Sequence, residues 1–180
     1  MILTGPPGAG KTTVSRLLAS HFEKSAVIGS DWFWTTVVNG SIDPWLPDTN
    51  AQNEAMLRSA FATASRLSWA GYFTVVEGII GPWFLGAARE ELSDLGGELS
   101  YVVLRPPLET CLQRAVDRLV EPEHAHALSD EDPISHLYEQ FSALGIYEGN
   151  VVDNTGGPAE ETATSLAREI VESTRFSLGL

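Results

Sequence analysis

The eight residues GPPGAGKT, from Gly5 to Thr12, constrain this chain more than any other segment. They match the pattern G-x-x-x-x-G-K-[ST], in which converging backbone N–H groups bind phosphate and the glycines let the backbone approach it closely. Apolar residues 1–4 precede the loop, and residues 11–24 carry apolar side chains at helical spacing. The start of a helix adds partial positive charge at the same place. The sequence therefore predicts a site for the phosphates of a nucleotide.

Individual residues of this loop have specific expected roles. Lys11 is expected to reach the β- and γ-phosphates, and the hydroxyl of Thr12 is expected to bind Mg²⁺. The other loop residues that we expect to contact the nucleotide are Gly5, Gly8, Ala9, Gly10 and Thr13.

Short apolar runs alternate with longer amphipathic segments along the whole chain, which is the pattern of βαβ units. The expected strands are residues 1–4, 26–29, 72–78, 99–105 and 150–154. The expected helices are residues 11–24, 50–71, 82–95, 107–120, 132–144 and 158–174. This alternation predicts an α/β fold, a doubly wound parallel sheet of five strands in a three-layer sandwich. The length of 180 residues fits one domain, residues 1–180.

The composition argues against some classes of partner and location. The net charge of −13 repels phosphate backbones, so we expect no nucleic-acid partner. No run of about 18 apolar residues occurs, so we expect no membrane span. The N-terminus lacks the basic segment of a secretory signal, and the first strand is so short that a few upstream residues are expected. The single cysteine, Cys111, fits a reducing cytoplasm and lies in an apolar helical pattern, so we expect it to be buried.

Polar side chains follow each expected strand after the first. They are Asp31, Glu77, Arg105 and Asn154. Because ligands of parallel α/β sheets bind at the carboxyl ends of the strands, these residues are expected to face one crevice together with the glycine loop.

The two acidic residues of this group have more than one possible role. Asp31 could accept the proton of an attacking hydroxyl, bind Mg²⁺ through water, or cap the helix that follows it. Glu77 could orient Mg²⁺, contact a substrate, or be a solvated strand end, and the sequence leaves its role open.

Aromatic residues gather in the segments that flank the expected acceptor side of the crevice. Four of the five tryptophans lie there, namely Trp32, Trp34, Trp45 and Trp83. They could line a pocket for a flat or apolar acceptor, or simply pack between helices. Between Asp31 and Glu77 the only arginines are Arg58 and Arg66, both on one expected helix. This scarcity disfavours an anionic acceptor and favours a neutral hydroxyl compound.

Positive charge is expected near the other end of the crevice. Arg114 and Arg118 lie four residues apart and share one helix face, where they could surround a migrating phosphoryl group or form surface ion pairs. The polar, proline-bounded segment 119–133 is interpreted as a lid over the nucleotide. His124 and His126 in this segment are too few for a metal site and are expected to be solvated.

The combination of GPPGAGKTT, an aspartate after the second strand, Arg-x-x-x-Arg and VVDNTG resembles the small P-loop kinases. Within them the chain is similar to shikimate/gluconate-kinase-like and chloramphenicol-phosphotransferase-like proteins. The resemblance implies a P-loop NTPase fold with strand order 2-3-1-4-5 and a helical lid. It also implies Asp31 as base, Arg114 and Arg118 as lid arginines, and residues 154–157 near the adenine. The glutamate at 77 and the tryptophan-rich region depart from the family, and no arginine set matches the one that holds shikimate, so the acceptor does not carry over.

Three functions follow from these observations. The first is an ATP- and Mg²⁺-dependent phosphotransferase that acts on a hydroxyl of a small neutral molecule, such as an antibiotic, an aromatic metabolite or a sugar-like compound. In it, Lys11, Asp31, Arg114 and Arg118 would be catalytic, Thr12 and Asp31 would hold the metal, and Arg114 and Asn154 would contact ATP. The acceptor would contact Asp31, Trp32, Trp34, Trp45, Glu77 and Trp83. The alternatives are a nucleotide or nucleoside kinase and a nucleotide-binding regulator with slow hydrolysis. The oligomeric state and the choice between ATP and GTP stay open.

Overall fold

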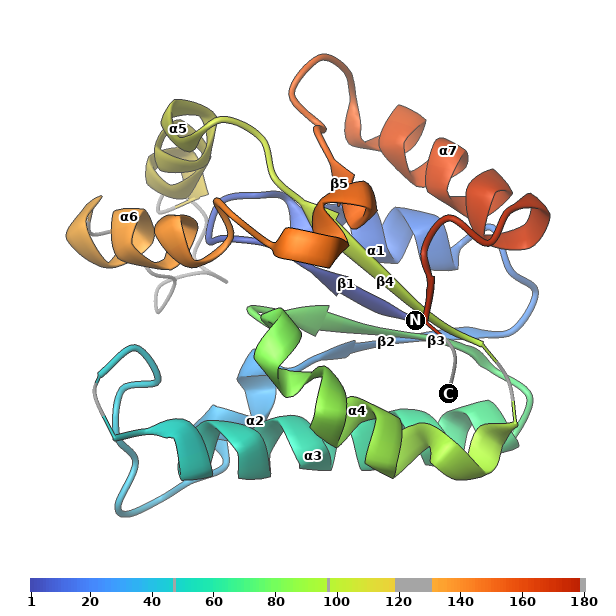
Figure 1. Ribbon diagram of the computed structural model, residues 1–180, viewed down its shortest axis with the longest axis horizontal. Helices are drawn as coiled ribbons and strands as arrows, with labels where there is room; N and C mark the ends of the chain where they lie inside the picture. Colours follow the sequence, from blue (N-terminus) through green and yellow to red (C-terminus); the bar gives the residue numbers. More distant parts are fainter. Residues whose placement is uncertain (47, 97, 119–130, 179–180) are drawn as a thin grey trace.

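The centre of the structure is a parallel β-sheet (Figure 1). A computed structural model of the chain describes residues 1–46, 48–96, 98–118 and 131–178. The five parallel strands are β1 (Ile2–Thr4), β2 (Ser25–Gly29), β3 (Phe73–Gly78), β4 (Leu99–Leu104) and β5 (Val151–Val152). Their order is β2-β3-β1-β4-β5, which confirms the strand order that the family resemblance implies.

Helices cover both faces of this sheet, as expected for a three-layer sandwich (Figure 1). The α-helices are α1 (Lys11–Ala19), α2 (Asp31–Thr35), α3 (Asn50–Trp69), α4 (Leu85–Leu92), α5 (Leu108–Arg118), α6 (Glu131–Gln140) and α7 (Ala159–Glu172). Short 3-10 turns are η1 (Pro82–Phe84), η2 (Ser93–Leu95) and η4 (Gly145–Asn150). In Figure 1, α1 and α7 lie on one side of the sheet, and α3 and α4 lie on the other.

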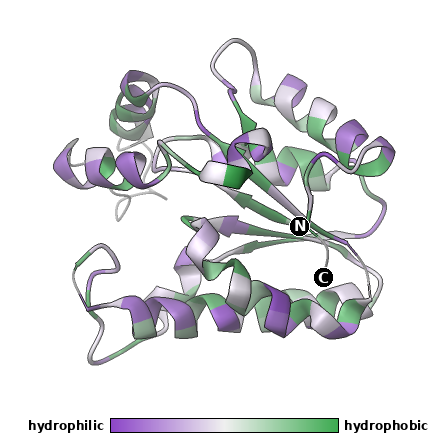
Figure 2. Cartoon of the chain, viewed as in Figure 1, coloured by the Kyte–Doolittle hydropathy of each residue, from purple (hydrophilic) through white to green (hydrophobic). Residues whose placement is uncertain are grey.

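The strands are nearly continuously apolar because both of their faces are buried. In β1, Ile2 packs into the core shared with α3 and α4, whereas its neighbour Leu3 packs into the core shared with α1 and α7. Val76 and Val75 of β3 divide between the two cores in the same way. Figure 2 shows the hydrophobic colour concentrated in the central strands, whereas hydrophilic and hydrophobic residues alternate along the helices.

The structure differs from the expected elements mainly at their ends. The helix expected over residues 11–24 stops at Ala19, because Phe22 belongs to a turn and stacks on Phe73 with ring centroids 3.7 Å apart. The short helix α2 and the strand β6 (Ser177–Leu178) are not among the expected elements, although a helix after Asp31 is one of the alternatives for that residue. Strand β6 has only two residues and pairs antiparallel with the beginning of β4, a contact that periodicity does not reveal.

The lid expected over residues 119–133 lies outside the described residues, apart from positions 131–133, where α6 begins. His124 and His126 lie in the same gap. Among the helices of the described ranges, none combines the length and the apolarity that crossing a bilayer requires.

The core on the α3 side of the sheet generates a stability prediction. Phe61 of α3 is fully buried and belongs to the same cluster as Leu57 and Val76. We expect Phe61→Ala to lower the free energy of unfolding by about 3–4 kcal/mol, because it removes apolar contacts and leaves a cavity. Ser59→Ala, at an exposed position of the same helix, should change it by less than about 0.5 kcal/mol. Urea denaturation of both variants measures the difference, and equal effects would contradict the packing described.

Candidate functional site

The glycine loop is held by backbone from two other segments. Gly5 and Gly8 have φ angles of +146° and +77°, which side chains with a Cβ rarely adopt. A Cβ on Gly5 would overlap the carbonyl oxygen of Leu104, and one on Gly8 would overlap the carbonyl oxygen of Cys111. The end of β4 and the helix α5 therefore press directly on the loop, and only glycine fits at these contacts.

The side chain of Cys111 is fully buried, which confirms the burial expected from its apolar helical pattern. Burial raises the pKa of its thiol to about 11, so the sulfur is neutral at physiological pH. A thiol in this state is a poor nucleophile.

Lys11 is the first residue of α1, and its ammonium group lies over the loop. Its Nζ donates a hydrogen bond to the carbonyl oxygen of Pro6 at 2.9 Å. The amide of Ala9 donates to the same oxygen at 3.2 Å. The left-handed Gly10 precedes the helix, so a positive side chain, a helix start and a turn of backbone amides meet here. This combination suits an anion with several oxygens.

Glu77 at the end of β3 faces the same loop. Thr12 donates a hydrogen bond from its hydroxyl to Oε1 of Glu77 at 3.1 Å. The Glu77 side chain is 8% exposed, and the next strand places Gly29 beside it. A hydroxyl and a carboxylate are the oxygen donors that Mg²⁺ prefers, so these two residues fit that ion. The sequence left the role of Glu77 open between orienting Mg²⁺, contacting a substrate and being a solvated strand end; its burial and its bond to Thr12 argue against the solvated strand end.

The described residues offer no cluster of three or more histidine, cysteine, aspartate or glutamate side chains for a metal. A Mg²⁺ ion at Thr12 and Glu77 would take its remaining ligands from nucleotide phosphates and water, which is its usual manner of binding in nucleotide sites.

Asp31 lies beside Glu77 because β2 and β3 end together. The amide of Ser30 donates to the carbonyl oxygen of Glu77 at 2.8 Å, which fixes the end of β2 against β3. Asp31 then opens the helix α2 as its first residue, and its carboxylate is exposed. A Cβ on Gly78 would lie 3.7 Å from Oδ1 of Asp31, so the carboxylate lies next to the end of β3.

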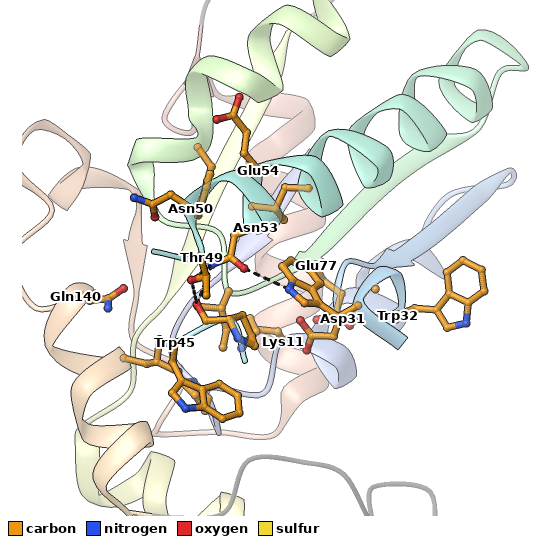
Figure 3. Close-up of a pocket in the computed structure, with 18 of the residues that line it drawn as sticks. Lys11, Asp31, Trp32, Trp45, Thr49, Asn50, Asn53, Glu54, Glu77 and Gln140 are labelled. Carbon is orange, nitrogen blue, oxygen red and sulfur yellow. Dashed lines mark hydrogen bonds between the residues drawn. The ribbon is translucent and has the colours of Figure 1, made fainter. Parts of the chain in front are cut away.

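A cavity of about 1100 Å³ joins these groups to the tryptophans. Figure 3 shows Lys11 and Asp31 near its centre, with Trp45 and Trp32 on different sides. Leu137 and Gln140 of α6 also line it. The residues of the sequence-based site that line the cavity are Lys11, Thr12, Asp31, Trp32, Trp34, Trp45, Glu77 and Trp83.

Asn53 of α3 organises one wall of this cavity. Its Oδ1 accepts a hydrogen bond from the indole Nε1 of Trp34 at 3.3 Å, and its Nδ2 donates to the carbonyl oxygen of Pro44 at 2.8 Å. Its Nδ2 also donates to the Thr49 hydroxyl at 3.2 Å. Sequence reasoning missed this residue. The available signal was an asparagine at the first position of the apolar stripe that continues with Leu57.

Arg114 and Asn154 connect two further segments to the loop. Nη2 of Arg114 donates to the backbone oxygen of Asn154 at 3.1 Å, and Nδ2 of Asn154 donates to the carbonyl oxygen of Ala9 at 2.8 Å. These two residues lie behind the loop, next to Gly10, and do not line the cavity. The side chain of Arg118 lies outside the described part of the structure.

Two other arginines are occupied by ion pairs. Arg105, which follows β4, donates to Glu148 of η4 at 2.8 Å and to the carbonyl oxygen of Phe141 at 2.7 Å. These hydrogen bonds from Arg105, together with one from the Leu144 amide, lower the pKa of Glu148 to about 2. Arg105 therefore fastens η4 to the end of the sheet. Arg58 pairs with three glutamates of α3 and α4.

A family model described as "AAA domain" matches residues 1–133. A search of the curated proteins found no match.

Solved structures of similar fold cover nearly the whole chain. The APS kinase of Mycobacterium tuberculosis, solved with AMPPNP and APS, has a TM-score of 0.66 and 21% identity, with coverage of 95% of this chain and 96% of that one. The tunicamycin resistance protein of Deinococcus radiodurans has a TM-score of 0.64 and 16% identity, with 95% and 94% covered. The shikimate kinase of Acinetobacter baumannii, solved with shikimate, has a TM-score of 0.55 and 23% identity, with 94% and 91% covered. At these identities the likeness shows the shared fold.

The Asn53 hydrogen bonds generate a prediction that needs no ligand. We expect Asn53→Ala to lower the free energy of unfolding by about 1–3 kcal/mol, because the buried Asn53 amide makes part-buried hydrogen bonds with the Trp34 indole and the Pro44 carbonyl that alanine cannot make. The tryptophan emission spectrum should change as well. Gln52→Ala is a matched control, since Gln52 also bonds the preceding loop, at Ile42, but through hydrogen bonds that are exposed to solvent. If both variants lose equal stability and neither alters the emission, Asn53 does not hold Trp34.

Proposed function

Because this chain belongs to the AAA domain family and has the fold of the small P-loop kinases, we propose that it is an ATP-dependent phosphotransferase. It would move the γ-phosphoryl group of ATP to a hydroxyl of a small molecule. One observation carries this proposal. A single cavity of about 1100 Å³ is lined both by Lys11 and Thr12 of the phosphate loop and by Asp31 and four tryptophans. A donor phosphate and an acceptor can therefore meet in one cavity.

The donor half of the site would hold ATP and Mg²⁺. The backbone amides of the glycine loop and the ammonium group of Lys11 would bind the β- and γ-phosphates. Thr12 and Glu77 would hold Mg²⁺, with Asp31 contributing through water, and the bound ion would neutralise charge on the phosphates. Asn154 would support the loop from behind and lie near the adenine.

The transfer step needs a base and neutralising charge. The acceptor oxygen would bond to the γ-phosphorus while the bond from that phosphorus to the β,γ-bridging oxygen breaks, so that ADP leaves. The proton of the acceptor hydroxyl would pass to the carboxylate of Asp31. Lys11 would balance the negative charge of the transition state, and the family resemblance assigns Arg114 and Arg118 to the same task, although Arg114 here bonds the Asn154 carbonyl outside the cavity.

The acceptor half favours a compound without anionic groups. Among the lining residues within the described ranges, Lys11 is the only lysine or arginine, and the proposed donor occupies it. Arg58, the nearest candidate by sequence, pairs with Glu54, Glu90 and Glu91 and does not line the cavity. An antibiotic, an aromatic metabolite or a sugar-like compound that carries a hydroxyl fits these walls.

A nucleoside kinase is the second candidate, because tryptophan faces also stack on bases. A nucleoside monophosphate is disfavoured, since its phosphate would lack a described arginine clamp. A regulator with slow hydrolysis would not need so large a space beside the phosphate site.

The acceptor can be found by a thermal-shift screen of antibiotics, aromatic alcohols, sugars, nucleosides and monophosphates in the presence of AMPPNP and Mg²⁺. A compound that binds the folded protein raises its unfolding midpoint. Transfer of label from γ-labelled ATP to each hit then decides between the candidates. Binding of ATP without transfer to any hit would contradict the kinase proposal.

The first variant to test is Lys11→Ala. We expect a loss of AMPPNP binding of at least about tenfold and loss of ATP turnover, because the charge that faces the phosphates is gone. The chain has only two lysines, so Lys24→Ala, at an exposed position, is a matched control that should bind normally. Calorimetric titration measures both. Unchanged nucleotide affinity in Lys11→Ala would rule out the assigned site.

The second variant is Asp31→Asn. We expect AMPPNP affinity to stay within about threefold, while transfer to the acceptor falls by about 10²–10⁴-fold because the base is lost. Asp43→Asn, in the exposed loop before α3, should transfer at the normal rate. Full transfer activity in Asp31→Asn would overturn the assignment of the base.

A further inference from the structure

The charges of the cavity wall identify the chemical class of the acceptor more closely. The lining side chains that carry charge are Lys11, Asp31, Glu54 and Glu77. Lys11 and Glu77 contact the glycine loop and Thr12, on the phosphate side. The acceptor side therefore has two carboxylates, Asp31 and Glu54, and no basic side chain among the described lining residues.

The negative charge near Glu54 is not cancelled by its partner. Arg58 donates to Glu54 at 2.8 Å, but also to Glu90 at 2.7 Å and to Glu91 at 3.1 Å. One guanidinium thus serves three carboxylates, and the four residues together carry a net charge of −2. The side chain of Glu54 is 47% exposed and lines the cavity. This wall attracts a cation.

The tryptophans present ring surface to the same space. Trp32 is 65% exposed, Trp83 54% and Trp45 37%, and all three line this cavity. Trp34 uses its indole N–H for Asn53, so its carbon surface is what remains for a ligand. The faces of indole rings attract cations more strongly than those of other aromatic side chains.

Two neutral polar side chains of the lining, Asn53 and Thr49, are less available. The amide of Asn53 and the hydroxyl of Thr49 bond to each other and to carbonyl oxygens of Pro44 and Leu46. They hold the loop before α3 in place, so they are poorly placed to bind the many hydroxyls of a neutral polyol.

We propose that the phosphoryl acceptor is an amino alcohol, with an ammonium group that binds in the cavity lined by the tryptophans and Glu54 and a hydroxyl that faces Asp31. The inference rests on the proposed phosphotransferase function and narrows its acceptor from compounds without anionic groups to positively charged ones. Aminated sugars and aromatic amino alcohols belong to this class.

Matched compounds test the charge directly. The probes are 2-amino-1-phenylethanol with 1-phenylethane-1,2-diol, glucosamine with glucose, and choline with 3,3-dimethylbutan-1-ol. Binding is measured by quenching of tryptophan fluorescence with AMPPNP and Mg²⁺ present, at pH 7. We expect the amine of at least one pair to bind about fivefold or more tightly than its neutral partner, with a smaller ratio at high salt. If no amine exceeds its partner, the inference is overturned.

Two glutamates that share Arg58 provide a matched pair of variants. Glu54→Gln removes a charge that lines the cavity, whereas Glu90→Gln removes one that does not. Glu54→Gln should weaken amine binding by about fivefold and leave the neutral probe unchanged, and Glu90→Gln should alter neither by more than about twofold. AMPPNP affinity reports that both variants are folded. Equal effects of the two variants on amine binding would contradict the role of Glu54.

Label transfer from γ-labelled ATP separates the two proposals. Tight binding of amines without transfer to any compound of the screen would contradict the phosphotransferase function. Transfer to neutral compounds alone, with amines excluded, would overturn the acceptor class and leave the phosphotransferase function in place.

Discussion

The close contact of the glycine loop with the carbonyl oxygens of Leu104 and Cys111 is the constraint on which the rest of the site depends. It brings the end of β4 and the first part of α5 against Gly5 and Gly8, with no room for a Cβ. The loop is thereby fixed relative to the sheet. Because α1 begins at Lys11, the same contact also fixes where the ammonium group and the Thr12 hydroxyl lie.

Hydrogen bonds connect the ends of the neighbouring strands β3 and β2 to this loop. Thr12 reaches Glu77 at the end of β3, and the Ser30 amide ties the end of β2 to the same strand. Asp31 follows as the start of α2. On the far side of the loop, Asn154 holds the Ala9 carbonyl. The donor half is therefore a continuous set of backbone and side-chain contacts. The acceptor half is an open cavity whose walls are tryptophan side chains and carboxylates.

Much of the fold was predictable because its signals are local. The alternation of apolar strands and amphipathic helices indicated the sandwich, and the family resemblance implied the strand order that the structure has. The ends of elements were less accurate, as at Ala19, where a stack of Phe22 on Phe73 replaces the last helical turn. The pairing of β6 with β4 joins segments that are far apart in the chain, so no local sequence pattern predicts it.

The arginines show that residue type and position along the sequence do not by themselves identify the residues of a site. Arg105 stands at the carboxyl end of a strand, yet it pairs with Glu148 and serves the fold. Arg58 lies on the acceptor side of the chain and is held by three glutamates. Asn53, which no motif marks, shapes the acceptor wall through Trp34 and Pro44.

The sequence by itself determined the phosphate loop, the alternating α/β pattern and the strand ends that carry Asp31 and Glu77, because each depends on residues adjacent in the chain. Only the tertiary structure decided which partner each polar side chain has. In the tertiary structure the Thr12 hydroxyl bonds Glu77 and the Trp34 indole bonds Asn53. Glu54 lines the cavity and belongs to a group of three glutamates that share one arginine. Such pairings depend on the relative placement of separate helices and strands, and side-chain packing between them is not encoded in any local repeat.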